Sequence, residues 1–261
     1  MATIQVFVVV STEKVNEAGK LAAVHRKSVR GRSVIEFHNV TLGYSGTNLL
    51  SDVSMKLAPG SFHFLTGPSG AGKTSLIKLC YGEMASSAGR VEVFGKDIGQ
   101  LSRDDVALMR RRIGIVHQDC QFLDHLSVAE NVLLPLEVAD LDPDPQSLEE
   151  LLAWVGLAER AKSLPPSLSG GERQRAALAR AVITAPDIIL ADEPTGNLDS
   201  KNGGHIFELL LKLNRDRQTT LLLVTHDQQL AGLADRKISL RDGRVVEDIL
   251  LSSDSRNAAK V

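Results

Sequence analysis

The 261-residue sequence contains only two cysteines, and neither sign of charge is in surplus. Cys80 and Cys120 stand far apart and outside any Cys-x-x-Cys pair, which argues against a disulfide framework and a cysteine zinc site and is typical of a reducing cytoplasm. Lys and Arg total 30 against 32 Asp and Glu. The chain thus lacks the basic surplus that phosphate contacts require, and we expect no nucleic acid among its partners.

Long hydrophobic runs are also missing, since no uninterrupted apolar run approaches the roughly 18 residues of a membrane span. The short run Ile4–Val10 has no basic segment before it and no clear cleavage site, which argues against a signal peptide. Apolar residues make up 43% and charged residues 24%, as in ordinary globular proteins. The length fits one large domain or two small ones.

The two ends of the chain differ from its middle. After Ile4–Val10, residues 1–33 are polar and basic without an apolar period, and we expect a disordered extension. Two alternatives remain open: a basic arm that touches acidic lipid headgroups, and a translation start near Val34, where a strand pattern begins. Residues 251–261 are polar and predict a tail, so residues 34–250 form the expected folded domain.

Between these ends, strand and helix patterns alternate, which predicts an α/β fold. The expected strands are Val34–Phe37, Phe62–Thr66, Arg90–Phe94, Ile113–His117, Ile188–Ala191, Leu221–Thr225 and Lys237–Leu240. The expected helices are Lys73–Tyr81, Asp104–Arg111, Gln146–Val155, Glu172–Thr184 and Gly204–Arg215. Residues from about 121 to 171 carry helical and loop signals without a clear strand, and we interpret them as a helical insertion. There is no internal repeat and no sustained heptad.

The segment GPSGAGKT follows the strand FHFLT and opens a helix, which is the setting of a phosphate loop. Its glycines allow a tight turn in which successive N–H groups face the phosphates, and the helix N-terminus adds partial positive charge. Lys73 is expected to reach the β and γ phosphates, and the Thr74 hydroxyl to bind Mg²⁺. The expected nucleotide-binding residues of this segment are Gly67, Pro68, Ser69, Gly70, Ala71, Gly72, Lys73, Thr74 and Ser75.

A second element, IILADE, places two carboxylates at the end of a buried strand. In a parallel sheet this end lies beside the phosphate loop. Asp192 is expected to hold Mg²⁺, and Glu193 to accept a proton from the attacking water or to orient it. In the alternative interpretation, the Asp–Glu–Pro sequence only ends a strand in a solvated turn. The presence of a phosphate loop in the same chain disfavours this alternative.

Many protein families contain a phosphate loop, and the segment LSGGE at Leu168–Glu172 distinguishes among them. With it, residues 34–250 resemble the nucleotide-binding domains of ABC ATPases, in which LSGGE is the signature. Gln118 in VHQD resembles the Q-loop glutamine of that family, Asp199 in GNLD the D-loop aspartate, and His226 in VTHD the switch histidine. Tyr44 stands where the family places the aromatic ring that stacks on adenine.

Each of these residues also has an ordinary interpretation. Tyr44 alone is a half-buried strand aromatic, His226 a hydrogen-bonded residue at a strand end, and Gln118 a surface amide. Ser169 alone is a helix cap, with Glu172 in the first turn. The occurrence of all these elements in the order of the family favours the resemblance.

The resemblance implies a phosphate-loop (RecA-like) ABC ATPase core with an inserted helical subdomain and a small antiparallel β region at its start. It implies ATP as ligand, Mg²⁺ held by Thr74, Gln118 and Asp192, and catalysis by Glu193, Gln118 and His226. Ser169, Gly170 and Gly171 begin a helix, an anion site in its own right, which in this family caps the γ-phosphate of a second chain's ATP. The expected assembly is therefore a head-to-tail dimer of two copies around two ATP molecules.

The resemblance is strongest to the cell-division branch of the family, carried by FLTGPSGAGKTSLIKL and LADEPTGNLD. It implies an FtsX-like integral membrane protein as partner and a peripheral location at the cytoplasmic face of the membrane. ATPases of lipoprotein release and macrolide export are the alternative. In this family the partner's cytoplasmic helix docks on the helical insertion, at Gln118–Leu136, and Phe122, Leu123 and Leu126 either line that groove or belong to the core. Thr74–Ser75 stands where many relatives have Ser–Thr, and Arg173 stands where glutamine is common.

Two rival functions come from other classes. A soluble ABC ATPase that acts on DNA carries long coiled coils or zinc modules, and this sequence has neither. A nucleotide sensor without hydrolysis would not need Glu193, Gln118 and His226 together. We therefore expect an ATP hydrolase.

Overall fold

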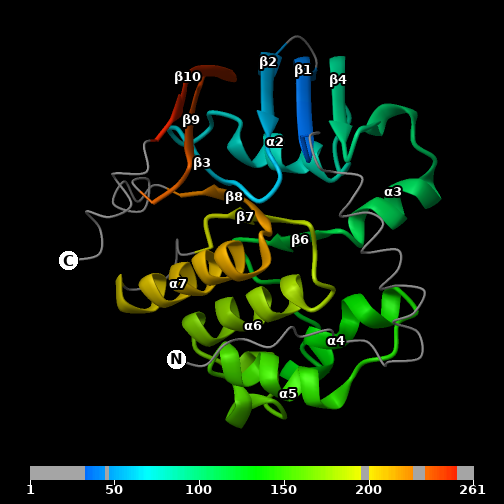
Figure 1. Ribbon diagram of the computed structural model, residues 1–261, viewed down its shortest axis with the longest axis vertical. Coiled ribbons are helices and arrows are strands. Elements are labelled where there is room, and N and C mark those ends of the chain that lie inside the picture. The colour runs from blue at the N-terminus through cyan, green and yellow to red at the C-terminus, as the bar shows by residue number, and fades with distance from the viewer. Residues whose placement is uncertain (1–32, 45–46, 195–199, 226–232, 252–261) are drawn as a thin grey trace.

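The computed structural model of the chain describes residues 33–44, 47–194, 200–225 and 233–251, which form two β-sheets with helices around them (Figure 1). The antiparallel sheet has the order β2-β1-β4-β5 and comprises β1 (Ile35–Tyr44), β2 (Thr47–Leu57), β4 (Ala88–Val93) and β5 (Lys96–Asp97). The other sheet has the order β10-β9-β3-β8-β7-β6 and comprises β3 (Phe62–Thr66), β6 (Ile113–Val116), β7 (Ile188–Asp192), β8 (Thr220–Val224), β9 (Arg236–Arg241) and β10 (Arg244–Leu250). All its neighbours pair in parallel except β10, which is antiparallel to β9.

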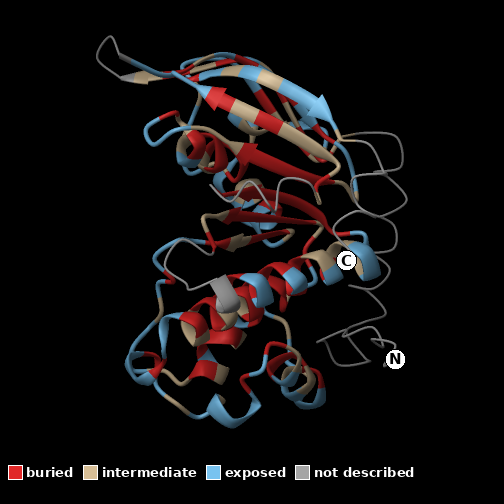
Figure 2. Cartoon of the chain, turned by 90° about the vertical axis from the view of Figure 1, so that its left-hand side faces the viewer, coloured by how far each residue is buried: buried red, intermediate tan, exposed pale blue. Residues whose placement is uncertain are grey.

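The parallel sheet is buried on both faces because its strands are apolar without alternation. Along β7, Ile189 packs into one core and its neighbours Ile188 and Leu190 into another on the opposite face. Figure 2 shows these buried strands in the middle of the molecule, with exposed residues toward the outside. The sequence prediction of an α/β fold with a buried strand at Ile188–Ala191 is confirmed.

The helices divide between the two faces. Helix α2 (Lys73–Cys80) shares its core with the antiparallel sheet, whereas α6 (Gly170–Val182) and α7 (Ser200–Arg217) cover the other face. Helices α4 (Val128–Val138) and α5 (Pro145–Trp154) pack against α6, so they form an outer layer on that second face (Figure 1). Helix α3 (Arg103–Arg110) precedes β6.

Residues 121–171 contain α4, α5 and two short 3₁₀ turns, without a β-strand. Asn131, in α4, is fully buried, and its side chain forms hydrogen bonds with the segment that precedes the helix. Its amide nitrogen donates to the carbonyls of Leu123, Leu126 and Ser127, and its oxygen accepts from the Leu123 N–H at 2.9 Å. Ser127 and Glu130 form a capping box at the start of α4.

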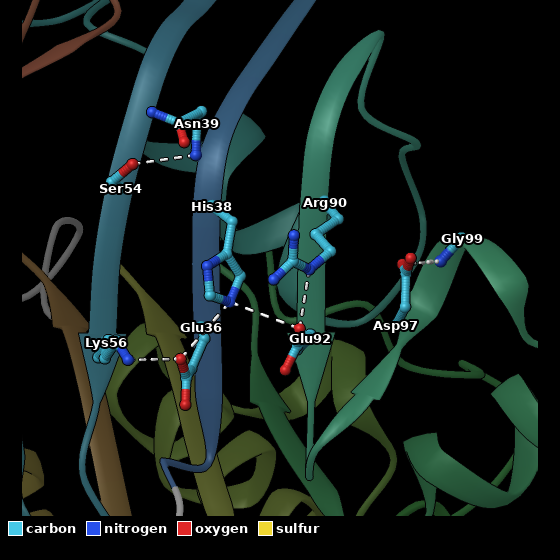
Figure 3. Close-up of polar contacts among 9 residues, drawn as sticks. All are labelled: Glu36, His38, Asn39, Ser54, Lys56, Arg90, Glu92, Asp97 and Gly99. Carbon is cyan, nitrogen blue, oxygen red and sulfur yellow. Dashed lines mark hydrogen bonds and ion pairs between the residues drawn. The ribbon is translucent and has the colours of Figure 1, made fainter.

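The antiparallel sheet is apolar toward α2 and charged on its other face. Glu36 of β1 lies opposite Lys56 of β2 and Glu92 of β4. Figure 3 shows the result: Lys56 pairs with Glu36 at 2.8 Å, and Arg90 with Glu92 at 2.8 Å. His38 lies between the two carboxylates, 3.5 Å from each. The cations offset the repulsion that two carboxylates on adjacent strands produce.

Some predicted boundaries are wrong. The sequence patterns missed β2, β5 and β10 and did not resolve α4, which has a proline, Pro135, inside it. Strand β1 runs on to Tyr44, and α6 begins two residues before Glu172, at Gly170. The pattern of β2 is hidden because its pairing with β1 contains register shifts, and Asp52 has a positive φ of 55°.

Both cysteines are free thiols and buried. Burial raises the pKa of Cys80 far above its usual value and that of Cys120 to about 11. Within the described ranges, no helix is both long and apolar enough to cross a membrane.

Candidate active site

The loop between β3 and α2 holds its backbone in a tight turn. Gly72 caps α2 with a left-handed φ of 100°, and a Cβ there would lie 2.7 Å from the carbonyl oxygen of Leu49. A Cβ on Gly67 would lie 2.1 Å from the carbonyl oxygen of Leu240. Glycine is therefore required at both positions by close packing against neighbouring backbone. Pro68, Ser69 and Gly70, at the tip of the loop, are exposed.

Lys73, the first residue of α2, directs its ammonium group back over the mouth of this loop. The Nζ atom donates to the carbonyl oxygens of Gly67 at 2.8 Å and Pro68 at 2.9 Å. The residue is only 7% exposed. A buried cation and the N-terminus of α2 thus act on the same exposed loop. Both favour a bound anion.

Asp192 ends β7 next to α2. Burial raises the pKa of this carboxyl group, while a hydrogen bond from the Thr74 side chain lowers it. Glu193 and Lys73 act on the same carboxyl group electrostatically, so all four residues share one neighbourhood. Glu193 has a positive φ of 47°, and its N–H donates to the Val224 carbonyl at 2.9 Å, which fixes the backbone at this point.

The donor set at Asp192 fits a magnesium ion. A carboxylate and a hydroxyl supply hard oxygen ligands, and Mg²⁺ in nucleotide sites binds one or two protein groups together with phosphates and water. Among the residues that the structure describes, no group of three or more His, Cys, Asp or Glu side chains could hold a metal by itself. Asp192 and Thr74 therefore suit a cation that arrives with its nucleotide.

The signature segment begins α6 on the opposite face of the parallel sheet from α2. Ser169 caps this helix: its Oγ accepts from the Glu172 N–H at 3.3 Å, and the Glu172 carboxylate accepts from the Ser169 N–H at 2.8 Å. Ser169 and Gly170 are exposed, whereas Gly171 is buried. The cap interpretation is thus correct in itself, and the N-terminus of the helix that Ser169 caps is exposed.

Gln118 follows β6 and is exposed. Its carbonyl accepts a hydrogen bond at 3.2 Å from the buried side chain of Gln174 in α6. This contact joins the Gln118 segment to the signature helix, and nothing in the local sequence indicated it. A second residue missed by the sequence patterns is His117, which acts electrostatically on Asp192.

Three predicted site residues cannot be placed. The side chain of Tyr44, the last residue of β1, and the residues Asp199 and His226 lie outside the described part of the chain. Of the remaining residues, the structure brings together the phosphate loop, Thr74, Asp192 and Glu193, whereas Ser169 caps a different helix, α6.

Comparison with known proteins agrees with this geometry. The sequence pattern of the ABC transporter family matches residues 50–196. The chain is 40% identical over 220 residues to the cell division ATP-binding protein FtsE of Streptococcus pneumoniae serotype 2, an alignment that covers 83% of this chain and 95% of that protein. It is 39% identical over 230 residues to the lipoprotein-releasing system ATP-binding protein LolD 1 of Rhodospirillum rubrum, with coverage of 87% and 96%.

Among solved structures, the chain resembles the dimeric post-hydrolysis state of the ATP-binding cassette MJ0796 bound to ADP and Pi. The TM-score is 0.77 and the identity 34%, over 84% of this chain and 99% of that one. A second dimeric structure of MJ0796, described as a bacterial ABC transporter cassette, has the same TM-score at 35% identity. The chain therefore belongs to the ABC transporter family, as an ATP-binding cassette that hydrolyses ATP.

Proposed function

We propose that the chain is the ATPase subunit of a membrane complex in bacterial cell division, with an FtsX-like integral membrane protein as its partner. The observation that carries this proposal is the likeness to FtsE: 40% identity to the Streptococcus pneumoniae protein and 36% to that of Bacillus subtilis, each over at least 95% of the relative's length. The chain then sits at the cytoplasmic face of the membrane through its partner. ATP-driven closure of the dimer bends that partner, which controls cell-wall hydrolases.

The proposed chemistry assigns one role to each group at the phosphate loop. The loop amides and Lys73 bind the β and γ phosphates, and Thr74 and Asp192, with Gln118, hold the Mg²⁺ that neutralises charge on them. Glu193 accepts a proton from the attacking water. His226 and Asp199 complete the site near the γ-phosphate, and Tyr44 stacks on adenine.

The second half of the proposed site comes from another copy of the chain. Ser169 begins α6, which packs on the opposite face of the parallel sheet from α2, the helix of the phosphate loop. Its exposed position suits contact with ATP on a second chain, and MJ0796, of similar fold, forms dimers. Two chains in head-to-tail arrangement then enclose two ATP molecules, and hydrolysis reopens them.

The experiment is co-purification with a membrane partner. The tagged chain is co-expressed separately with an FtsX-like protein and with the membrane subunits of a lipoprotein-release system from the same genome. Retention of the FtsX-like protein, together with an ATPase rate that changes on its binding, supports the cell-division role. Retention of only the lipoprotein-release subunits would replace it with the second candidate, which the LolD 1 likeness favours. Glu193→Gln, which should bind either partner without hydrolysis, is the matched control for the rate.

A further inference from the structure

The turn between β9 and β10 contacts the phosphate loop, although it lies near the other end of the sequence. The Gly243 N–H donates to the carbonyl oxygen of Ala71, in the loop, at 3.2 Å. The Gly243 carbonyl accepts from the Ser51 N–H of β2 at 2.8 Å. One residue of the C-terminal hairpin thus joins the loop to the antiparallel sheet through backbone atoms alone. The hairpin of β9 and β10 lies beside β2 (Figure 1).

The geometry of this turn admits only glycine at its second position. Asp242 and Gly243 have φ values of 48° and 71°, and the flanking residues Arg241 and Arg244 pair with each other, as in a two-residue type I′ hairpin. A Cβ on Gly243 would lie 2.6 Å from the carbonyl oxygen of Leu49 and 3.0 Å from the Cα of Leu50. These are backbone atoms, so no side-chain rotation relieves the contact.

The same two segments support the rest of the loop from outside. The carbonyl of Leu240 lies against Gly67, and the carbonyl of Leu49 lies against Gly72. Thr66, at the end of β3, also donates a hydrogen bond to Ser239 of β9 at 3.1 Å. The outer side of the loop therefore rests on the β9–β10 hairpin and on β2, while its exposed side is left for a ligand.

We propose that Gly243 is a positioning residue for the phosphate loop: by linking Ala71 to β2, it holds the loop amides in their binding geometry before ATP arrives. Groups that are held in the bound geometry cost less to order on binding. The inference rests on the proposed role of Gly67–Thr74 as the phosphate site. It adds to that site a residue that touches neither ATP nor the reacting atoms.

The test compares Gly243→Ala with Gly156→Ala in the full chain. Gly156 has a φ of 70° and therefore the same backbone strain, but a Cβ there would meet only the Arg175 Nε atom, at 4.0 Å. We expect KM for ATP to rise about tenfold in Gly243→Ala and less than twofold in Gly156→Ala. The value of kcat should change less than twofold in both, because misplaced amides weaken ground-state and transition-state binding alike. Equal KM values in the two variants would overturn the proposal.

A second measurement does not depend on the folding of a variant. In the unaltered chain, addition of ATP and Mg²⁺ should slow hydrogen exchange of the Gly243 amide, because a fixed loop opens less often. The turn at Phe94–Gly95 has similar φ values of 52° and 78° and is the internal control, with no expected change. Unchanged exchange at Gly243 would also overturn the proposal.

Lys73→Ala separates this inference from the assignment of the loop. If Lys73→Ala keeps its ATP affinity, the phosphate-loop assignment fails and the role of Gly243 fails with it. If Lys73→Ala loses affinity while Gly243→Ala behaves like Gly156→Ala, only the positioning role is wrong.

Discussion

Acidification should destabilise the protein through His63, a histidine enclosed in the parallel sheet. His63 lies in β3 between β8 and β9 and is 1% exposed. Burial, with a smaller contribution from Arg236, lowers its pKa to about 4, whereas Asp235 and Asp248 act in the opposite direction. The ring is therefore neutral in the folded chain at neutral pH.

Hydrogen bonding explains why the folded state resists protonation of this ring. The Ser61 hydroxyl donates to the Ala58 carbonyl at 2.6 Å, so its oxygen accepts from His63 Nε2–H at 2.5 Å. The other nitrogen, Nδ1, is buried and has no hydrogen-bond partner among the described residues. A proton added there creates a charge and a donor without an acceptor, which a protein interior disfavours.

The sign and size of the effect follow from linkage. In the unfolded chain this histidine titrates near its ordinary pKa of 6.5, so between pH 6.5 and about 4 the unfolded chain binds more protons than the folded chain. The contribution of neutral His63 to the free energy of unfolding is thus fully present above pH 6.5, and it is lost as the pH falls from 6.5 to about 4. The total loss is about 3 kcal/mol, of which about 2 kcal/mol appears between pH 7 and pH 5.

The assay is urea unfolding at pH 7, 6 and 5, followed by the fluorescence of Trp154, the single tryptophan. His63→Gln cannot take up the proton, so its free energy of unfolding should fall about 2 kcal/mol less than that of the unaltered chain over this range. His125→Gln removes an exposed histidine and should follow the unaltered chain. Parallel pH dependence of His63→Gln and the unaltered chain would refute the reasoning.

Three further predictions concern the site and its supports. Lys73→Ala should weaken ATP binding at least tenfold, about 1.4 kcal/mol, in a fluorescent-nucleotide titration; unchanged affinity contradicts the phosphate-loop assignment. Glu193→Gln should slow hydrolysis about a hundredfold and accumulate an ATP-bound dimer in sedimentation. Addition of Ser169→Arg should abolish that dimer, and its persistence would exclude the composite site. Asn131→Leu should lower the free energy of unfolding by about 3 kcal/mol by leaving backbone groups unpaired, against about 1 kcal/mol for the cap variant Ser127→Ala. If urea unfolding gave equal losses of free energy for Asn131→Leu and Ser127→Ala, the hydrogen bonds of Asn131 would not be the main stabilisation of the segment before α4.

Local signals explain what the sequence predicted. The glycines and Lys73 of the phosphate loop stand between a buried strand and a helix. The parallel strands are apolar runs, so they can be predicted from their own residues without knowledge of their partners in the sheet. The carboxylates at Asp192 and Glu193 follow from the direction of a parallel strand. These local features are therefore sufficient to predict the fold class and the centre of the candidate site.

Tertiary contacts explain what the sequence did not show. Strand β10 is a largely exposed edge strand in which apolar and polar residues do not alternate, and β2 pairs with β1 through irregular register. The bond from Gln174 to Gln118 and the contact of Gly243 with Ala71 join residues far apart in the chain. Such contacts depend on how sheets and helices meet, and no local pattern encodes them.

The burial of both thiols has a practical consequence for chemical labelling. A thiol reacts as its thiolate, and the raised pKa values of Cys80 and Cys120 leave almost none at neutral pH. Val138, at the end of α4, is 76% exposed. A cysteine introduced there should take up a maleimide probe selectively, without replacement of either native cysteine. In a symmetric dimer it would place one spectroscopic label on each chain, so that the distance between the labels reports each closing and reopening.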